Sequence, residues 1–222
     1  MAHRPESLAD LPETIPVFPL SGALLLPFGQ RPLNIFEPRY LDMVDDALAG
    51  DRLIGLIQPV ETNEESPTGQ AALQKTGCIG RITHFEEHPD GRYFIILSGI
   101  CRFRVKAEPR RAQFAYRVAR IDVADFARDF DRTHGEETVD RAKFLKMMHD
   151  YAAFAEIDLN WDEIKQTGTA DLVNFCCMVS PYGPAEKQVL LEAADLNERA
   201  ETLIAMAEYE MARGGTGAAP LQ

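Results

Sequence analysis

The sequence lacks the signature motifs of the common nucleotide-dependent and hydrolytic enzymes. It contains no Gly-x-x-x-x-Gly-Lys-Ser/Thr loop to hold ATP phosphates, and no Gly-x-Gly-x-x-Gly segment follows a predicted strand. A Gly-x-Ser-x-Gly nucleophile elbow is also missing. A hydrolase would need a nucleophile and a base in contact, and no such pair is evident in the sequence. We therefore expect a protein with no catalytic residues and no cofactor.

Long apolar runs are missing as well. No stretch approaches the roughly 20 consecutive apolar residues that a membrane-spanning helix needs. The first residues, MAHRPESLADLPET, have no apolar core of the kind found in secretory signals. The composition, 45% hydrophobic and 26% charged, fits an ordinary soluble globular protein. These features predict a cytoplasmic protein that does not contact membranes.

The spacing of the cysteines supports neither a metal site nor a disulfide. The four cysteines are Cys78, Cys101, Cys176 and Cys177, and none forms a Cys-x-x-Cys motif. Adjacent cysteines rarely satisfy disulfide geometry, so we expect buried, reduced thiols and no zinc site.

One segment, His84-Phe85-Glu86-Glu87-His88, matches the inverted zinc-protease pattern His-x-x-Glu-His. That chemistry requires a helix, which brings residues four apart onto one face. Here the segment runs into the turn signal Pro89-Asp90-Gly91 between two predicted strands. On a strand the two histidines would be about 13 Å apart, too far to share one ion, so we expect no metal.

Positive charge is scarce in the second half of the chain. Residues 1–120 carry 14 Lys and Arg against 15 Asp and Glu, a balance of −1, while residues 121–222 carry 9 against 20, a balance of −11. The asymmetry favours two units with different surfaces. The acidic half argues against general nucleic-acid binding, which needs a basic footprint.

The first half reads as short strands with proline and glycine at the corners. Extended segments are expected at 15–20, 32–36, 52–58, 78–87, 92–97, 101–106 and 114–118, with a buried run at 24–26 and a helix from Pro38 to about Ala49. Gly50 suits the position after that helix, and Gly99 is expected at a bulge or corner. Residues 60–76 are expected to form a flexible polar loop. This pattern predicts a small, partly open β-barrel.

From residue 125 the apolar spacing becomes helical. Phe144, Met147, Met148, Tyr151 and Phe154 recur at about 3.5 residues, and capping signals begin further helices near Asn160, Thr169, Pro184 and Asp195. We expect an α+β protein with a β-barrel lobe at 13–124, a helical-bundle lobe at 125–213, and flexible tails at 1–12 and 214–222. Phe28, Phe36, Met147, Met148 and Met178 are expected in the core.

Two groups of residues are candidates for binding. Along 101–106 the side chains alternate, and this places Arg102, Arg104 and Lys106 on the outward face of a strand. That face is either a solvated wall, an internal clamp to the acidic lobe, or a contact surface for an acidic partner. Further basic residues follow at Arg110, Arg111, Arg117 and Arg120. Arg39 and Tyr40 form the second group, although Arg39 is also suited to tie its helix to the barrel.

Residues 15–44 resemble the opening of the N-terminal domain of Lon proteases. The resemblance rests on Pro-Val-Phe-Pro-Leu at 16–20, Leu-Leu-Pro at 25–27 and Leu-Asn-Ile-Phe-Glu-Pro-Arg-Tyr at 33–40. Gly77–Ile82, Leu97–Phe103 and the segment 180–206 also resemble that family, so the similarity covers about residues 13–212. It implies a PUA-like β-barrel followed by closing helices.

The resemblance also suggests a function. In Lon proteases this region helps to bind substrates and supports oligomer assembly, while the ATPase and Ser-Lys protease domains follow it. We therefore expect a non-catalytic module that binds polypeptide segments or a protein partner, as an adaptor or regulator in proteolysis, with a homo-oligomer as one option. The alternative is an RNA- or nucleotide-associated protein, since PUA-like barrels elsewhere bind RNA. The acidic half disfavours that alternative.

Overall fold

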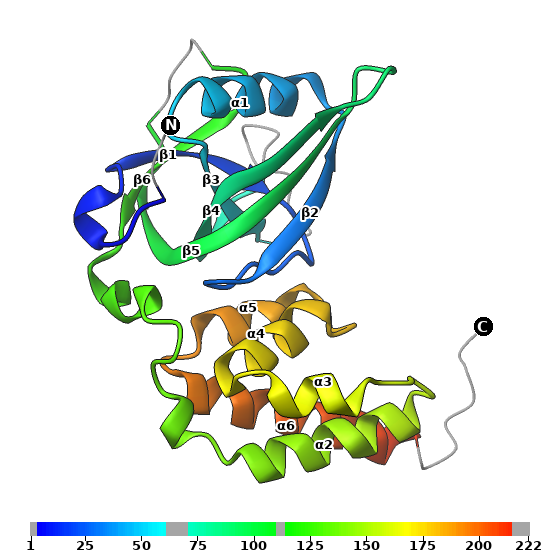
Figure 1. Cartoon of the computed structure of the whole chain (residues 1–222). Helices are drawn as coiled ribbons and strands as arrows, with labels where there is room; N and C mark the ends of the chain where they lie inside the picture. Colours follow the sequence, from blue (N-terminus) through cyan, green and yellow to red (C-terminus); the bar gives the residue numbers. More distant parts are fainter. Residues whose placement is uncertain (1–3, 61–70, 110–113, 215–222) are drawn as a thin grey trace.

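The structure, a computed structural model, describes residues 4–60, 71–109 and 114–214. We call residues 13–124 the β lobe and residues 125–213 the helical lobe. Figure 1 shows the strands gathered in one body and α2 to α6 in a second body beside it. The elements in chain order are η1 Leu8–Asp10, β1 Thr14–Pro19, β2 Gln30–Ile35, α1 Pro38–Ala49, β3 Leu53–Pro59, β4 Leu73–Glu87, β5 Tyr93–Ala107, β6 Arg117–Asp122, η2 Ala124–Phe130, η3 Glu136–Thr138, α2 Arg141–Phe154, α3 Trp161–Gln166, α4 Thr169–Val179, α5 Pro184–Glu192 and α6 Leu196–Gly214.

The strands form a partly closed mixed sheet, as expected. Their order is β2-β5-β4-β3-β1-β6, and β5 also pairs with β6. The long strand β5 makes both contacts, because its first half pairs with β2 and its last residues pair with β6. The ring β1-β3-β4-β5-β6 therefore closes, while β2 extends the sheet outward. The α+β class and the barrel-then-bundle arrangement are confirmed.

Glycine 99 marks a bulge within one continuous strand. Gly80 pairs with Gly99 while Ile79 pairs with Cys101, so Ile100 is an extra residue on β5. The expected bulge is therefore confirmed, but the strands predicted at 92–97 and 101–106 are one strand. A close approach explains the glycine, since a Cβ at Gly99 would lie closer than 3.0 Å to the carbonyl oxygen of Leu26.

Several expected boundaries move because of pairings distant in sequence. Leu73 pairs with Pro59 and Thr76 with Arg104, so β4 begins inside the segment expected to be a loop; residues 61–70 lie outside the described residues. The last strand begins at Arg117 instead of near Phe114. The Tyr116 hydroxyl donates to Asp46 of α1 at 2.6 Å, which takes that residue out of the sheet.

Residues 4–12 differ from the expected flexible tail. Asp10 accepts hydrogen bonds from the backbone N–H groups of Glu6 and Ser7, which closes the short helix η1. Leu8 and Leu11 then pack against the apolar cluster inside the barrel. The contacts of these two partly buried leucines offset the entropy of ordering this segment. Residues 1–3 and 215–222 lie outside the described part of the chain.

One apolar cluster runs through both lobes. It includes Leu24, Leu25 and Leu26 of the β lobe and Phe144, Met147, Met148 and Met178 of the helical lobe. The three methionines are buried, as the helical spacing predicts. Phe36 contradicts its predicted core position, because it follows the end of β2 and its side chain is 66% exposed. A shared apolar core means that the two lobes pack against each other directly.

The four cysteines are free thiols, three of them fully buried and Cys176 half-buried. Burial raises the pKa of Cys176 and of Cys177 to about 12, and also raises the pKa of Cys78 and Cys101. At pH 8 a thiol of pKa about 12 is ionised in only about one molecule in 10⁴, and the thiolate is the reactive form.

We therefore expect the folded protein to react slowly with a disulfide reagent such as Ellman's reagent at pH 8. Unfolding in guanidinium should release all four thiols at once. A Lys165→Cys variant supplies the control, since Lys165 is exposed on α3 and its replacement should react within seconds to minutes. Rapid modification of the native wild-type chain would contradict the burial of these thiols.

Candidate functional site at the junction of the lobes

Arg102 on β5 joins the β lobe to the helical lobe. Its guanidinium donates to both carboxylate oxygens of Asp129, at 2.9–3.3 Å. It also donates to the backbone carbonyls of Leu191 at 3.2 Å and Ala193 at 2.7 Å, at the end of α5. The backbone N–H of Arg102 donates to Asp129 as well, at 2.8 Å. Every side-chain nitrogen of this arginine therefore has a partner.

The same region holds a second buried arginine. Arg199 on α6 donates to the carbonyl of Leu190 and to the side-chain oxygen of Asn174, each at 2.9 Å. Burial, with the neighbouring Arg102 guanidinium as the next cause, lowers the pKa of Arg199 to about 10. The carboxylate of Asp129 thus offsets the positive charge of a region that contains two buried arginines. Through Arg102 it also connects η2 to β5 and to the end of α5.

Among the three alternatives for the basic strand face, the position of Arg102 matches the internal clamp, and Arg102 does not lie on an outward, solvated face. The alternation is real, because Cys101 and Phe103 fill the barrel, but η2 and the end of α5 cover Arg102 and leave it 7% exposed. Arg102 is an internal clamp. Only Arg104 and Lys106 remain exposed, and they pair with Asp125 and Asp122. Arg110 and Arg111 lie outside the described residues.

The second predicted group lies far from this clamp. Arg39 pairs with Glu37 at 2.7 Å and stacks on the Tyr40 ring, 4.6 Å from its centroid. Tyr40 is buried against Phe18, and burial raises its pKa. Figure 1 shows α1, which begins with these residues, at the end of the β lobe remote from α2 to α6. The structure therefore does not bring Arg39 and Tyr40 together with Arg102.

A buried amide network forms a second connection between the lobes. Gln58 on β3 donates to the Pro184 carbonyl at 2.9 Å and to the side chain of Gln188 at 3.1 Å. Gln188 donates in turn to the backbone carbonyl of Thr76 at 3.2 Å. These bonds hold the first turns of α5 against β3 and β4, so the junction is held in one geometry.

An exposed apolar surface adjoins this junction on α4. Asp171, Phe175, Met178 and Val179 are spaced four, seven and eight residues apart, which places them along one side of the helix. Phe175 is 61% exposed and Val179 is 58% exposed, whereas Met178 is buried.

Two contacts place the loop at Phe28 beside this side of α4. Arg132 forms a bidentate pair with Asp171, and its guanidinium lies 5.7 Å from the centroid of the Phe28 ring. Gly29 approaches Met178 so closely that an added Cβ would clash with its sulfur. We call Phe28, Phe175 and Val179 the junction patch. The sequence did not predict this patch, because nothing in the apolar pattern of the helix distinguishes the exposed Phe175 from the core residues beside it.

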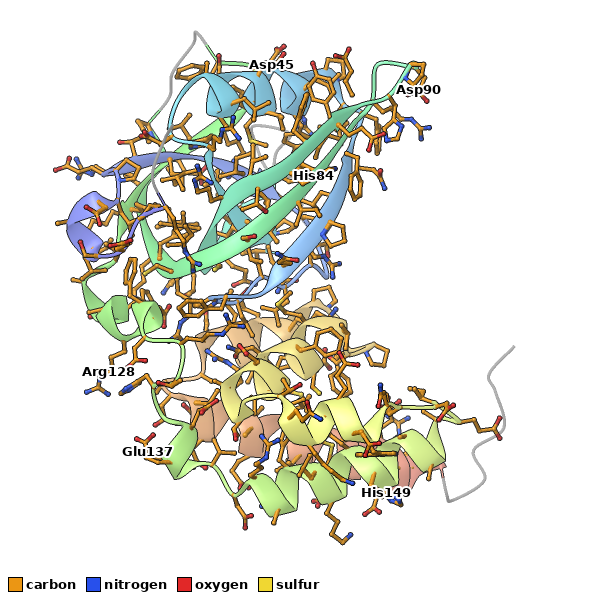
Figure 2. The ribbon with its side chains drawn as sticks, in the orientation of Figure 1. Asp45, His84, Asp90, Arg128, Glu137 and His149 are labelled. Atoms are coloured by element: carbon orange, nitrogen blue, oxygen red, sulfur yellow. The ribbon has the colours of Figure 1, made fainter. Side chains whose placement is uncertain are left out.

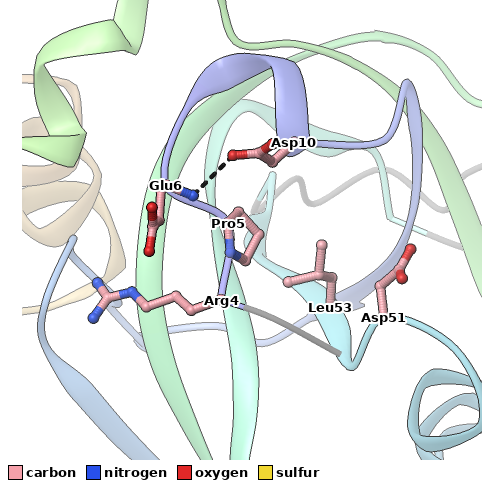
Figure 3. Close-up of a pocket in the computed structure, with 6 residues that line it drawn as sticks. All are labelled: Arg4, Pro5, Glu6, Asp10, Asp51 and Leu53. Carbon is pink, nitrogen blue, oxygen red and sulfur yellow. Dashed lines mark hydrogen bonds between the residues drawn. The ribbon is translucent and has the colours of Figure 1, made fainter. Parts of the chain in front are cut away.

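A hollow between the N-terminal segment and the start of β3 is a second candidate site. It has a volume of about 240 Å³ and is lined by Arg4, Pro5, Glu6, Asp10, Asp51 and Leu53. Figure 3 shows Asp10 turned toward the backbone of Glu6, and that 3.0 Å hydrogen bond is part of the η1 turn. Of the three acidic side chains in this hollow, that of Asp10 is thus part of the local structure.

The His-x-x-Glu-His segment lies where the sequence predicts. His84 is on strand β4, as Figure 2 shows, and Glu87 ends that strand before the turn. In the described residues 4–60, 71–109 and 114–214, no three His, Cys, Asp or Glu side chains gather as a metal ion would need.

The comparisons with known proteins agree with this architecture. The model of the ATP-dependent protease La (LON) substrate-binding domain family matches residues 14–208. The chain belongs to this Lon substrate-binding domain family. A Lon protease of Parabacteroides distasonis is 31% identical over 202 residues, which is 90% of this chain and 24% of that protein. One of Flavobacterium johnsoniae is 26% identical over 87% of this chain and 24% of its own length.

Two solved Lon N-terminal domains share the fold. A Lon N-terminal domain protein from Xanthomonas campestris has a TM-score of 0.59 at 22% identity, over 86% of this chain and 97% of that one. The N-terminal domain of a Mycobacterium avium complex Lon protease has a TM-score of 0.63 at 18% identity, over 88% and 98%.

The Lon similarity is confined to one region of those proteases. The chain spans about a quarter of the length of the Lon proteases described above, and the matched family is defined as a substrate-binding domain. Within the part of this Lon-family chain that the structure describes, no helix is both long and apolar enough to cross a bilayer.

Proposed function

We propose that this chain is a non-catalytic module that binds apolar segments of unfolded polypeptides at the junction patch. In this proposal it acts in the cytoplasm as an adaptor or regulator of proteolysis. Membership of the Lon substrate-binding domain family supports polypeptide recognition. The observation that carries the site is the pair of exposed side chains Phe175 and Val179, one turn apart on the helix whose Asp171 is joined through Arg132 to the Phe28 ring.

The junction patch has the properties of a recognition surface. Exposed aromatic and aliphatic side chains side by side are costly in water, and such surfaces frequently mark contact sites. Two contacts hold α4 beside the β lobe: Arg132, which pairs with Asp171, lies over the Phe28 ring, and the buried Met178 lies against Gly29. A preformed surface binds without the entropy cost of ordering itself.

The expected test result is loss of peptide binding when the patch is made polar. A fluorescent, unstructured peptide that contains phenylalanine and leucine should bind the wild type, and a Phe175→Ser, Val179→Ser variant should bind at least tenfold more weakly, about 1.4 kcal/mol. Both side chains are exposed, so melting temperature should change little.

The matched control is Tyr209→Ser on α6, whose ring is 65% exposed outside the junction patch. That variant should bind as the wild type does. Equal losses in both variants, or unchanged binding in the double variant, would reject the junction patch as the site. Cleavage of the peptide by the pure wild-type protein would reject the non-catalytic assignment.

A further inference from the structure

Strand β2 has one open edge. It stands at the end of the sheet and pairs with β5 on one side. No strand in residues 4–60, 71–109 or 114–214, which the structure describes, pairs with its other side. Gln30, Pro32 and Asn34 are exposed along this strand. Figure 1 shows β2 on the outside of the β lobe, where it runs from the junction of the lobes toward α1.

The hydrogen bonds at the start of β2 show which backbone groups face the open edge. The N–H of Gly99 donates to the Gly29 carbonyl at 2.8 Å, and the register pairs Arg31 with Leu97, two residues further along each strand. Hydrogen-bonded pairs alternate along an antiparallel ladder, so every second residue of β2 bonds to β5. The residues that bond to β5 are therefore Arg31, Leu33 and Ile35. Those whose backbone groups point toward the open edge are Gln30, Pro32 and Asn34.

The position of Pro32 agrees with this assignment. Proline has no N–H to donate, and within sheets it is confined to places where that side of the strand faces solvent. The open edge therefore offers the N–H groups of Gln30 and Asn34, together with the carbonyls of all three residues. These groups are spaced as an added extended chain requires.

The open edge continues into the junction patch. β2 begins two residues after Phe28, whose ring lies beside Arg132, and Gly29 lies against Met178 of α4. At the other end, Phe36 directly follows β2 and is 66% exposed. An extended chain along β2 would thus have an aromatic side chain of this protein at each end of its path.

We propose that an extended segment of the bound polypeptide adds to β2 as a further strand, with an apolar side chain of the same segment on the junction patch. This inference rests on the proposed function and adds the backbone conformation of the ligand to it. Main-chain hydrogen bonds supply affinity that depends little on sequence, which suits a ligand that is unfolded. A second copy of this chain fits less well, because a contact between two β2 strands would contain Pro32 twice and lose a donor on each side.

Amide hydrogen exchange, resolved by residue with NMR, tests this geometry without any substitution. In the free protein the amides of Leu33 and Ile35 should be protected by β5, while those of Gln30 and Asn34 exchange rapidly. A saturating amount of the fluorescent phenylalanine- and leucine-containing peptide should slow exchange at Gln30 and Asn34 about tenfold or more. Protection of Asn34 in the free protein would mean that the edge is already covered, and unchanged exchange in the complex would mean that the peptide binds elsewhere. Either result overturns the inference.

Two substitutions at one position separate the backbone from the side chain. Asn34→Pro removes an N–H from the open edge and none from the ladder with β5, whereas Asn34→Ala keeps that N–H. We expect Asn34→Pro to bind the peptide about tenfold more weakly and Asn34→Ala to bind as the wild type does. Equal losses in both variants would assign the contact to the asparagine side chain and overturn strand addition.

Methylated peptides provide the same test on the ligand, and they do not depend on the folding of Asn34→Pro. Two versions of the peptide carry N-methyl groups on alternate residues, in opposite phases. Only one edge of an added strand faces β2, so one version should bind as the parent peptide does and the other about tenfold more weakly. Equal binding of the two versions overturns the inference.

The outcomes also separate this inference from the proposed function. Binding that is lost in Phe175→Ser, Val179→Ser but is unchanged by Asn34→Pro and by both methylation patterns overturns strand addition and leaves the proposed function in place. No binding of the parent peptide overturns both. A wild-type dimer in sedimentation that Asn34→Pro converts to a monomer would assign the open edge to a second copy and overturn the inference.

Discussion

Replacing Asp129 with alanine should lower the free energy of unfolding by about 3–5 kcal/mol. Asp129 accepts four hydrogen bonds from Arg102, three from the guanidinium and one from the backbone N–H, and both residues are buried. Without the carboxylate, the charge of Arg102 remains inside the junction with the Leu191 and Ala193 carbonyls as its hydrogen-bond acceptors and the Phe126 ring beside it. The cost is large because the remaining charge cannot reach water. For a chain of this size the melting temperature should fall by roughly 6–20 °C.

A matched exposed pair provides the control for this prediction. Asp125 pairs with Arg104 at 3.2 Å on the same two elements, but both side chains are more than half exposed. Asp125→Ala should cost no more than about 1 kcal/mol, since water replaces the lost partner. A double variant, Arg102→Met with Asp129→Leu, should recover much of the lost stability because it removes both charges. Thermal melts that show equal losses for Asp125→Ala and Asp129→Ala would contradict the clamp.

Charge reversal distinguishes the two parts of the basic strand. Arg104→Glu alone should leave the fold intact, because its side chain is exposed. Arg102→Glu should unfold the junction, since it would place a second carboxylate beside Asp129. Any test of this strand as a partner surface therefore has to use Arg104 and Lys106, without Arg102.

The sequence predicts this fold well where the signals are local. The alternation of apolar and polar residues identifies which side chains of β5 face the interior of the barrel. The helix from Pro38 to Ala49 has the predicted bounds. Asn160 accepts the backbone N–H of Glu163, as its capping spacing predicts. In each case the residues that decide the structure are neighbours in the chain.

Predictions fail where the deciding contact comes from a distant segment. Thr169 is predicted to cap α4, but Gly168 takes the cap position and the carboxylate of Glu136 accepts the N–H of Ala170. The alternation around Arg102 correctly separates the two faces of the strand, but it contains no information about the helix α5 that covers one of them. The junction patch is also a product of packing between the lobes, so no spacing rule could have found it.

A Gly99→Ala substitution should also destabilise the protein by about 3–5 kcal/mol, for a steric reason. The added Cβ would lie closer than 3.0 Å to two backbone atoms of Leu26, and a backbone cannot move aside as a flexible side chain can. Displacing that loop would break two hydrogen bonds, from Gly99 to the Gly29 carbonyl and from Phe28 to the Gly99 carbonyl.

The same displacement should weaken peptide binding, which connects the barrel bulge to the proposed function. Phe28 and the Gly29–Met178 contact belong to the displaced loop, so the junction patch would lose one side and α4 would lose its support. Gly183→Ala is the matched control, because its Cβ would meet only the end of the Glu186 side chain, which can turn away. Denaturant melts should therefore show a large loss for Gly99→Ala and less than about 1 kcal/mol for Gly183→Ala. A fully stable Gly99→Ala variant that still binds peptide would show that the loop is free to move without consequence, and would remove the support for a preformed recognition surface.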